Sequence, residues 1–319
     1  MRARAEAAIL GLAIGDALGM PAQGFAPAEI ARRFGRIADF LPAPDDNPIS
    51  RGLGAGMVTD DTEQALLLAR RLLAGPWDER AWARDLLEWE AGMRARGLAE
   101  LLGPSTRRAL EALMAGGDPA RTGLAGDTNG AAMRIAPLGI ACPPGPGLID
   151  RVVATSRVTH ATAPALGAAA AVAAAISAAI AGADWRAALA EGLSAAEAAA
   201  ARGAWVAGAE IAARIRLALE IAEPGRLAAA IGTGVLATES VATALGLVAA
   251  ARGDPWQAAL MAANIGGDTD TIGAIAGSVA AASGGALPPR AVETVTRVNG
   301  LRPGPLVEGL LAMRGTACA

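Results

Sequence analysis

Two short acidic segments, far apart in the chain, carry the residues best suited to chemistry. They are Thr59–Thr62, with the sequence TDDT, and Gly267–Thr271, with the sequence GDTDT. Carboxylates packed this densely repel one another unless a cation lies among them. Asp and Thr oxygens without Cys or His are ligands for a hard divalent ion such as Mg²⁺ or Mn²⁺ rather than for zinc. If the fold brings both segments together, their carboxylates could form a two-metal hydrolytic centre.

Helix capping is the alternative explanation for these acids. An Asp in the first turn of a helix complements the helix dipole and caps free N–H groups, which contributes about 0.3–1 kcal/mol. Capping accounts for one Asp per helix. It does not account for the adjacent acids Asp60 and Asp61, or for the same chemistry at Asp268 and Asp270. Metal binding is therefore the favoured interpretation.

Composition bounds the class of protein. The chain has 319 residues, of which 53% are hydrophobic and 18% charged, with a net charge of −3, so it can form one large domain. This near-neutral balance offers no basic stripe to displace counterions, which disfavours nucleic acid as a partner. The cysteines, Cys142 and Cys318, and the lack of a secretory cleavage pattern lead us to expect a reduced, cytoplasmic protein.

Helical periodicity dominates the chain and predicts the elements that position the acidic segments. Alternating strands and long linkers are missing from the pattern. The expected fold class is therefore all-α, a single compact multi-helix domain spanning residues 1–319. Beyond one helix before Gly19 and one after each acidic segment, helices are expected at about 105–115, 131–140, 148–157, 163–182, 184–200, 204–221, 238–252, 254–264, 270–283, 289–298 and 304–313.

Several features leave structural and functional roles open. The charge-free segment Ala161–Ala183 is long enough to cross a bilayer, but its alanines and the lack of flanking arginine clusters favour a buried helix and no membrane. His160 is the only histidine, which excludes Ser-His-Asp and multi-histidine metal schemes. It either makes structural hydrogen bonds or contacts a substrate. The stripe of Trp82, Trp89 and Met93 favours core packing over stacking on an adenine.

Together the motifs make the sequence recognisable. In order along the chain, the set resembles the ADP-ribosylglycohydrolase family, which includes the dinitrogenase reductase-activating glycohydrolase and the metal-dependent ADP-ribosyl-acceptor hydrolases. Any one motif alone would be weak, whereas their shared order is specific. The matching segments are Gly15–Gly19, Thr59–Thr62, Asn129–Arg134, Thr159–His160 and Gly266–Thr271.

The resemblance implies an all-α domain with two Mg²⁺ or Mn²⁺ ions that cleaves the bond between the anomeric ribose carbon and its acceptor. The substrate would be an ADP-ribosylated protein or a small ribosyl-containing molecule. The metal ligands would be Thr59, Asp60, Asp61, Asp268, Asp270 and Thr271. Asp60, Asp61 and Asp268 would act in catalysis, and Gln23, Asn129, Gly130, Met133 and His160 would line the substrate site. Arg134, directly after the cleft motif, is a candidate for a buried, hydrogen-bonded role.

One residue departs from the family pattern. Many relatives carry Glu at the position of Gln23, and a neutral amide cannot serve as a general base. Gln23 could equally be an ordinary surface residue. If it occupies the site, either an Asp takes the base role or the substrate is not protein-linked ADP-ribose. The alternatives are therefore a hydrolase of a small N-riboside or nucleoside, with loops 42–52 and 98–108 shaping the pocket, or a catalytically silent ADP-ribose-binding protein. A general two-metal phosphohydrolase is also compatible with the acidic segments alone.

Overall fold

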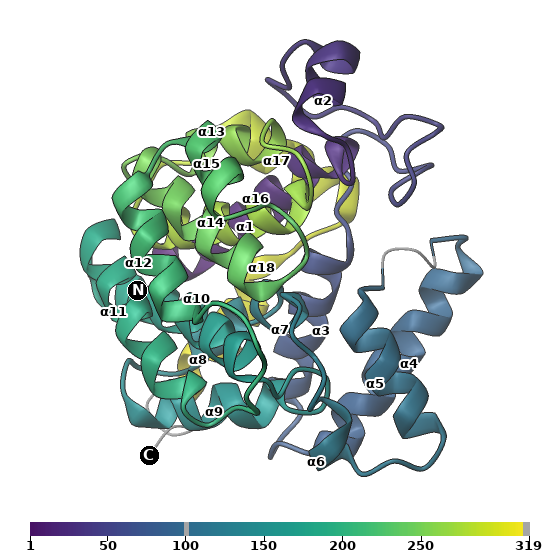
Figure 1. Ribbon diagram of the computed structural model, residues 1–319, viewed down its shortest axis with the longest axis vertical. Helices are drawn as coiled ribbons and strands as arrows, with labels where there is room; N and C mark the ends of the chain where they lie inside the picture. Colours follow the sequence, from purple (N-terminus) through teal and green to yellow (C-terminus); the bar gives the residue numbers. More distant parts are fainter. Residues whose placement is uncertain (99–101, 315–319) are drawn as a thin grey trace.

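Helices make up the computed structural model of the protein, which describes residues 1–98 and 102–314 (Figure 1). Within these ranges there is no strand, only two isolated bridges, Thr128 with Leu236 and Thr162 with Ala204. The all-α prediction is therefore confirmed. The helices of the first half are α1 Arg2–Gly19, the 3₁₀ turn η1 Met20–Ala22, α2 Pro27–Phe34, α3 Asp60–Leu73, α4 Glu79–Ala95, α5 Pro104–Met114, α6 Pro119–Thr122, α7 Gly130–Met133, α8 Ala136–Ala141 and α9 Pro146–Ser156. Those of the second half are α10 Ala163–Ala181, α11 Trp185–Ala200, α12 Ile211–Ile221, α13 Pro224–Ala230, α14 Ala237–Ala250, α15 Pro255–Ala263, α16 Thr269–Ala282, α17 Pro289–Asn299 and α18 Pro303–Met313.

The centre of the molecule is built from α1, α10, α14 and α16, whose faces are mostly alanine and glycine. Every residue of α16 is buried, and α10 is buried from Ala165 to Ile180. By length and hydropathy, α10 and the segment Arg2–Ala22 could each cross a membrane, but 83% of each apolar window is buried inside the protein. The predicted buried helix over Ala161–Ala183 is confirmed. Small side chains allow these four helices to approach closely and pack densely.

Glycines set the approach of α1 to α16. Gly11 and Gly15 of α1 face Gly277 and Gly273 of α16 across the interface. A Cβ atom on Gly15 would lie only 1.9 Å from the carbonyl oxygen of Gly273, so no larger residue fits. This contact places the C-terminal part of α1, which carries Asp16, directly against the start of α16.

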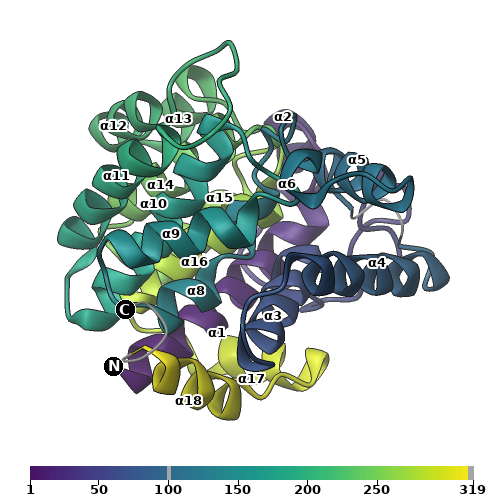
Figure 2. The same ribbon diagram turned by 90° about the horizontal axis from the view of Figure 1, so that it is seen from below.

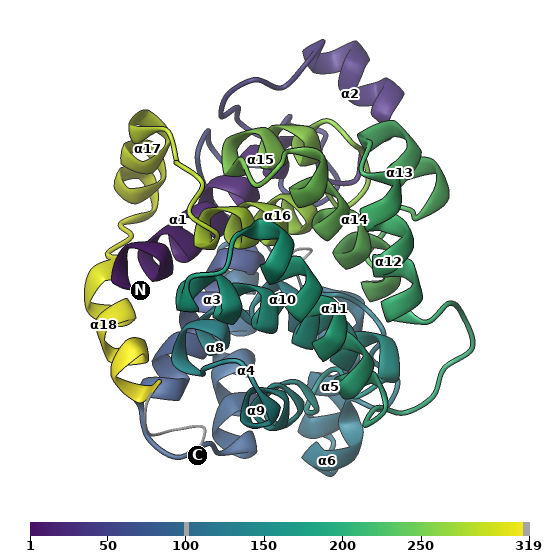
Figure 3. The same cartoon turned by 90° about the vertical axis from the view of Figure 1, so that its left-hand side faces the viewer.

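The other helices surround this centre. Helices α3, α4, α5 and α6 form one side of the molecule, with α4 and α5 projecting outward (Figure 2). Helices α17 and α18 lie along α1, and α11 to α13 cover the opposite side (Figure 3). The acidic segment before α3 therefore comes from the periphery, whereas that before α16 comes from the centre.

Two of the expected helices differ from the structure. The helix expected at 204–221 begins only at Ile211, because the backbone of Ala204 bonds with those of Ala161 and Ala163 instead of continuing a helix. The segment 131–140 divides into α7 and α8, and Pro137 lies in the first turn of α8. Three short helices, α2, α6 and α13, were not expected. All three begin with proline, which is favoured at the first helical position.

Two further expectations meet the limits of the described residues. The loop expected at 98–108 includes residues 99–101, which lie outside them, and from Pro104 onward the chain is helix α5 rather than loop. The expectation of reduced cysteines is wrong for Cys142, which is buried and disulfide-bonded. Cys318 lies outside the described residues.

Candidate metal centre

Asp16 of α1 organises the first acidic segment. Its carboxylate accepts hydrogen bonds from the backbone N–H groups of Thr59 (3.0 Å) and Thr62 (3.1 Å) and from both threonine hydroxyls (2.9 and 2.5 Å). The side chain of Thr59, at the N-cap position of α3, makes no capping bond of its own. Asp16 thus satisfies free N–H groups at the start of α3 from another helix. That arrangement leaves Asp60 and Asp61 available for a different purpose.

The second acidic segment is held by its backbone. Gly266 and Gly267 have φ angles of 85° and 75°, a region that favours glycine. Gly267 and the segment around Gly24 exchange hydrogen bonds: Gly267 N–H donates to Phe25 O and Gly24 N–H donates to Gly267 O, both at 2.9 Å. The N–H of Asp268 donates to Thr233 O at 2.8 Å. These contacts fix the turn that directs Asp268 and Asp270 toward α3.

The structure brings the two acidic segments together. Carboxylate oxygens of Asp16, Asp61 and Asp270 lie within 4.8 Å of one another. The hydroxyl of Thr59 lies among them, 3.1 Å from Asp61 Oδ2 and 3.3 Å from Asp270 Oδ2. Asp60 and Asp268 repel the same group electrostatically. We call these five carboxylates, Asp16, Asp60, Asp61, Asp268 and Asp270, the acidic centre.

The electrostatics of the acidic centre call for a cation. Burial, reinforced by neighbouring carboxylates, raises the pKa of Asp60, Asp61 and Asp270 well above the usual range. Burial also raises the pKa of Asp16 and Asp268 to about 6. No arginine of the described chain forms an ion pair with any of the five. Such a group is stable in its charged form only if a cation binds it.

Two orphaned oxygens indicate where a cation fits. Asp61 Oδ1 and Asp270 Oδ1 are buried and have no hydrogen-bond partner, although buried oxygens in proteins are nearly always satisfied. Both belong to the group whose ligand atoms approach within 4.8 Å. The potential metal ligands of this group are carboxylate and hydroxyl oxygens, which are the ligand atoms that Mg²⁺ and Mn²⁺ prefer. The residues present therefore fit a hard divalent ion.

The acidic centre has an inner part and an outer edge. Asp16 and Asp270 are 0% exposed and Asp61 is 1% exposed, whereas Asp60 and Asp268 retain 5% and 7%. A bound molecule would therefore meet Asp60 and Asp268 first. Asp268 is oriented by Asn129, whose Nδ2 donates to Asp268 Oδ2 (2.5 Å).

The segment that begins at Asn129 lies beside this outer edge. The Asn129 amide also donates to Ser240 Oγ (2.8 Å), which fixes its position. Gly130 packs against His160, since a Cβ atom at Gly130 would lie 2.8 Å from His160 Cε1. Met133 follows on the same short helix α7 and is buried. Of the predicted cleft residues, Asn129 contacts Asp268 directly and Gly130 contacts His160, whereas the role of Met133 stays a prediction.

His160 occupies a fully buried position. Its Nε2 lies 3.0 Å from Thr128 Oγ1 and its Nδ1 lies 2.8 Å from Thr159 Oγ1. Burial, together with the charges of Arg134 and Arg108, keeps the pKa of His160 well below its usual range, so the ring is neutral. These bonds satisfy both ring nitrogens, as the structural alternative for this residue requires.

Gln23 is not an ordinary surface residue. Its side chain is buried, and its Oε1 accepts a hydrogen bond from Ser50 Oγ at 2.9 Å. Its backbone carbonyl accepts another from Asn47 Nδ2 at 3.1 Å. Because Gly24 pairs with Gly267, Gln23 lies next to the second acidic segment and ties it to the loop that includes Ser50.

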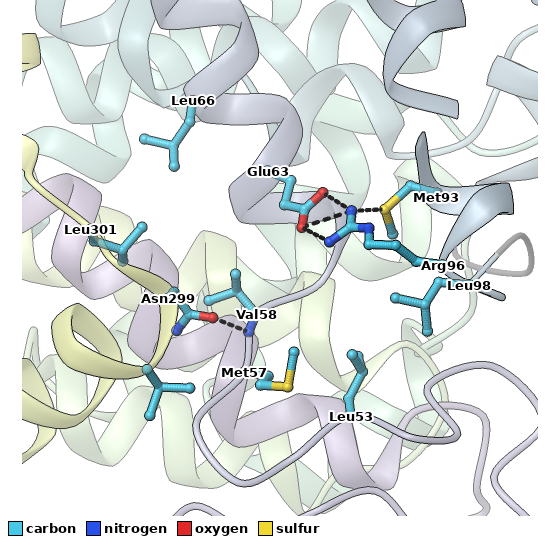
Figure 4. Close-up of a pocket in the computed structure, with 11 residues that line it drawn as sticks. Leu53, Met57, Val58, Glu63, Leu66, Met93, Arg96, Leu98, Asn299 and Leu301 are labelled. Carbon is cyan, nitrogen blue, oxygen red and sulfur yellow. Dashed lines mark hydrogen bonds and ion pairs between the residues drawn. The ribbon is translucent and has the colours of Figure 1, made fainter. Parts of the chain in front are cut away.

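The outer side of the first acidic segment looks different (Figure 4). There Glu63 pairs with Arg96 (2.9 Å) and accepts a hydrogen bond from Trp89 Nε1 (2.7 Å). Asn299 accepts from Val58 N (3.1 Å) and thereby attaches α17 to the chain just before Thr59. A cavity of about 260 Å³ lies here, bordered by Val58, Glu63, Arg96 and Asn299 and otherwise mostly by apolar side chains.

The structure also assigns residues that the motifs left undecided or missed. Trp82 and Met93 are buried in the core, so the packing role of that stripe is confirmed. Asp16, which lies in the family-like segment Gly15–Gly19, belongs to the acidic centre. Gln64 donates to Asp60 Oδ2 at 3.3 Å. The spacing of four residues between them places both on one helix face, a signal that could have identified Gln64.

Comparison with known proteins identifies the class to which this helical protein with a buried acidic centre belongs. The sequence profile of the ADP-ribosylglycohydrolase family matches residues 1–318. The chain is 36% identical over 287 residues to the uncharacterized protein YegU of Escherichia coli (strain K12), covering 86% of each chain. It is 33% identical over 164 residues to the ADP-ribosyl-[dinitrogen reductase] glycohydrolase of Rhodospirillum rubrum, covering 49% of this chain and 51% of that protein.

A solved structure agrees in fold over almost the whole length. The chain of an ADP-ribosylglycohydrolase-related protein complex matches with a TM-score of 0.73 and 32% identity, covering 98% of both chains. The protein therefore belongs to the ADP-ribosylglycohydrolase family, as its motifs predicted. This family consists of hydrolases.

Proposed function

We propose that the protein is a divalent-metal-dependent hydrolase that cleaves an ADP-ribosyl, or related ribosyl, glycosidic bond at the anomeric carbon. The observation that carries this proposal is the convergence of five buried carboxylates, two of them with an unpartnered oxygen, in a chain of this family. The substrate would be an ADP-ribosylated protein or a small ribosyl-containing molecule. The relative named as a glycohydrolase of ADP-ribosylated dinitrogen reductase supports this class of substrate.

The acidic centre would hold two Mg²⁺ or Mn²⁺ ions. When bound, such ions supply Lewis-acid polarisation of the ribose hydroxyls and of a water molecule. Asp16 would support this site from α1, where its carboxylate already accepts hydrogen bonds from the start of α3. The ligands that we assign are the six motif residues Thr59, Asp60, Asp61, Asp268, Asp270 and Thr271.

The residues at the outer edge would handle the substrate and the proton. Because Gln23 is neutral, we assign the proton of the attacking water to Asp60 or Asp268, the two most accessible carboxylates of the centre. Asn129 holds Asp268 in position for that role. Gly130, which has no side chain, would let the start of α7 lie against His160 at this edge of the acidic centre.

A substrate panel tests this function. ADP-ribosyl-arginine, ADP-ribosyl-serine and free nucleosides are incubated with the protein and Mg²⁺, Mn²⁺ or EDTA, and released ADP-ribose or ribose is quantified. We expect metal-dependent release of ADP-ribose from at least one conjugate. Turnover of nucleosides alone would indicate the smaller N-riboside reaction. Protein that binds ADP-ribose with metal but hydrolyses none of the substrates would contradict the proposal and indicate a silent binding protein.

A further inference from the structure

One buried arginine connects the acidic centre with the segment beside it. Arg134 follows α7 directly and is only 1% exposed, the second-largest side chain to be fully buried. Its Nη1 donates to Gln64 Oε1 at 2.7 Å and its Nη2 donates to Thr159 Oγ1 at 2.6 Å. Its guanidinium also lies 5.5 Å above the ring of Trp82. The side chain is therefore fixed by three neighbours from three different elements.

The first arm of this arrangement reaches Asp60. Gln64 receives the Arg134 N–H through its Oε1 and donates its own Nε2–H to Asp60 Oδ2 at 3.3 Å. Because the oxygen end of the amide is bound by Arg134, its nitrogen end must face the carboxylate. Arg134 thus sets which way Gln64 points, and Gln64 orients an accessible carboxylate of the centre.

The second arm reaches the Asn129 segment. Thr159 accepts from Arg134, so its single hydroxyl proton can go to His160 Nδ1 at 2.8 Å, a better acceptor position than Ser156 O at 3.5 Å. His160 then carries its proton on Nε2 and donates to Thr128 Oγ1. Thr128 immediately precedes Asn129, which holds Asp268.

Charge provides a second, independent reason for this arginine. Five carboxylates with two divalent ions leave one negative charge, which Arg134 balances. Burial lowers the pKa of the Arg134 guanidinium to about 10, and attraction to Asp60 acts in the opposite direction and favours its charged form. Burying a cation that has no carboxylate in contact costs free energy, unless an anionic site lies near enough to attract it.

We propose that Arg134 is a positioning residue of the acidic centre: one guanidinium orients Asp60 through Gln64, and orients the Asn129 segment through Thr159 and His160. This inference rests on the proposed function for its kinetic part and for the two divalent ions of the charge balance. Its geometric part concerns the binding of metal, which is measured without any substrate. Partners that orient metal ligands typically change metal affinity by about 10–100-fold when they are removed.

The test measures Mn²⁺ affinity of the full-length protein by titration calorimetry, with Arg134→Met compared to Arg314→Met. Arg314 is also partly buried and donates to carbonyl groups of α8 and α10, but none of its contacts leads to the acidic centre. We expect both variants to lower the melting temperature. Only Arg134→Met should weaken Mn²⁺ binding, by about 10–100-fold. Equal Mn²⁺ affinities in the two variants would overturn the inference.

Milder variants separate the two arms and protect against a failure to fold. Gln64→Met cuts the first arm and should weaken Mn²⁺ binding by about tenfold, with little further loss when combined with Arg134→Met. Thr159→Val cuts the second arm, which reaches Asp268 only through His160, Thr128 and Asn129, so it should raise KM and weaken Mn²⁺ binding less than Gln64→Met does. Arg134→Lys keeps the charge but cannot bridge both partners, so full recovery of Mn²⁺ affinity would contradict the bridging role.

The two proposals can fail separately. If the wild-type protein hydrolyses none of the conjugates but Arg134→Met still loses Mn²⁺ affinity, the proposed function is wrong and the positioning role stands. If the wild-type protein is active and Gln64→Met binds Mn²⁺ normally, the positioning role is wrong and the function stands.

Discussion

The two sides of the first turn of α3 treat acidic residues in opposite ways. On the outer side, Glu63 has an arginine partner, Arg96, and an indole N–H donor. On the inner side, Asp60 and Asp61 have no arginine in contact, and one oxygen of Asp61 has no hydrogen-bond partner. A single helical turn separates these environments. The difference teaches that the protein neutralises its acids with side chains where no external ion is needed, and leaves them unpaired where an ion can bind.

Removing one carboxylate of the acidic centre should have the largest effect on activity. Asp60→Asn or Asp268→Asn is expected to reduce metal-dependent turnover by more than about 100-fold, because the loss of a metal ligand exceeds the usual effect of its supporting partners. Initial rates over a range of Mn²⁺ concentrations measure this. Wild-type rates in both variants would mean that the acidic centre and the Glu63 side of α3 do not differ in function.

The position of Asp16 in the acidic centre depends on the close contact between α1 and α16. Gly15→Ala places a Cβ atom 1.9 Å from Gly273 O and should lower the free energy of unfolding by about 3 kcal/mol or more. The matched control is Gly92→Ala in α4, where a Cβ atom meets nothing within 4 Å. This control should stabilise the helix by roughly 0.5–1 kcal/mol. Denaturant unfolding monitored by circular dichroism compares the two, and equal effects would contradict the packing argument.

The pH dependence of metal binding sharpens the comparison further. Burial raises the pKa of Asp16 and Asp268 from 3.8 to about 6, so in the metal-free protein both bind protons below pH 6. A divalent ion must displace those protons, which costs up to about tenfold in apparent affinity per pH unit for each proton displaced.

Stabilisation by Mn²⁺ should therefore be small at pH 5 and should increase up to about pH 7. Calorimetric scans of matched samples with Mn²⁺ or EDTA give this difference, in which the ionisation of His160 affects both samples alike. A stabilisation by Mn²⁺ that is constant across this pH range would show that Asp16 and Asp268 are already charged without metal.

The smallest effect is expected on the outer side. Glu63→Gln removes the pair with Arg96, whose side chain is 50% exposed, and should lower the free energy of unfolding by no more than about 1 kcal/mol. Its turnover and its Mn²⁺ dependence should match those of the wild type. A loss of metal binding as severe as that of Asp60→Asn would mean that the two sides are not functionally distinct.

Much of this organisation could be predicted from local sequence. The apolar period over α3, α10 and α16 predicted their existence, because burial on one or all faces leaves a pattern within a few turns. The paired acids in Thr59–Thr62 and Gly267–Thr271 predicted an oxygen-rich centre from their chemistry alone. The helix expected from residue 204 failed because Ala204 finds its backbone partners at Ala161 and Ala163, far away in sequence.

The sequence by itself determined the family, the all-helical class and the residues that we propose as oxygen ligands. Only the tertiary structure decided that Asp16 caps α3 from another helix, that Gln23 is buried against Ser50, and that Arg134 links Gln64 with Thr159. The physical reason is the distance along the chain over which each kind of interaction acts. Periodicity and residue chemistry act within a few turns of chain, whereas hydrogen bonds between distant segments depend on how closely glycine and alanine allow whole helices to approach.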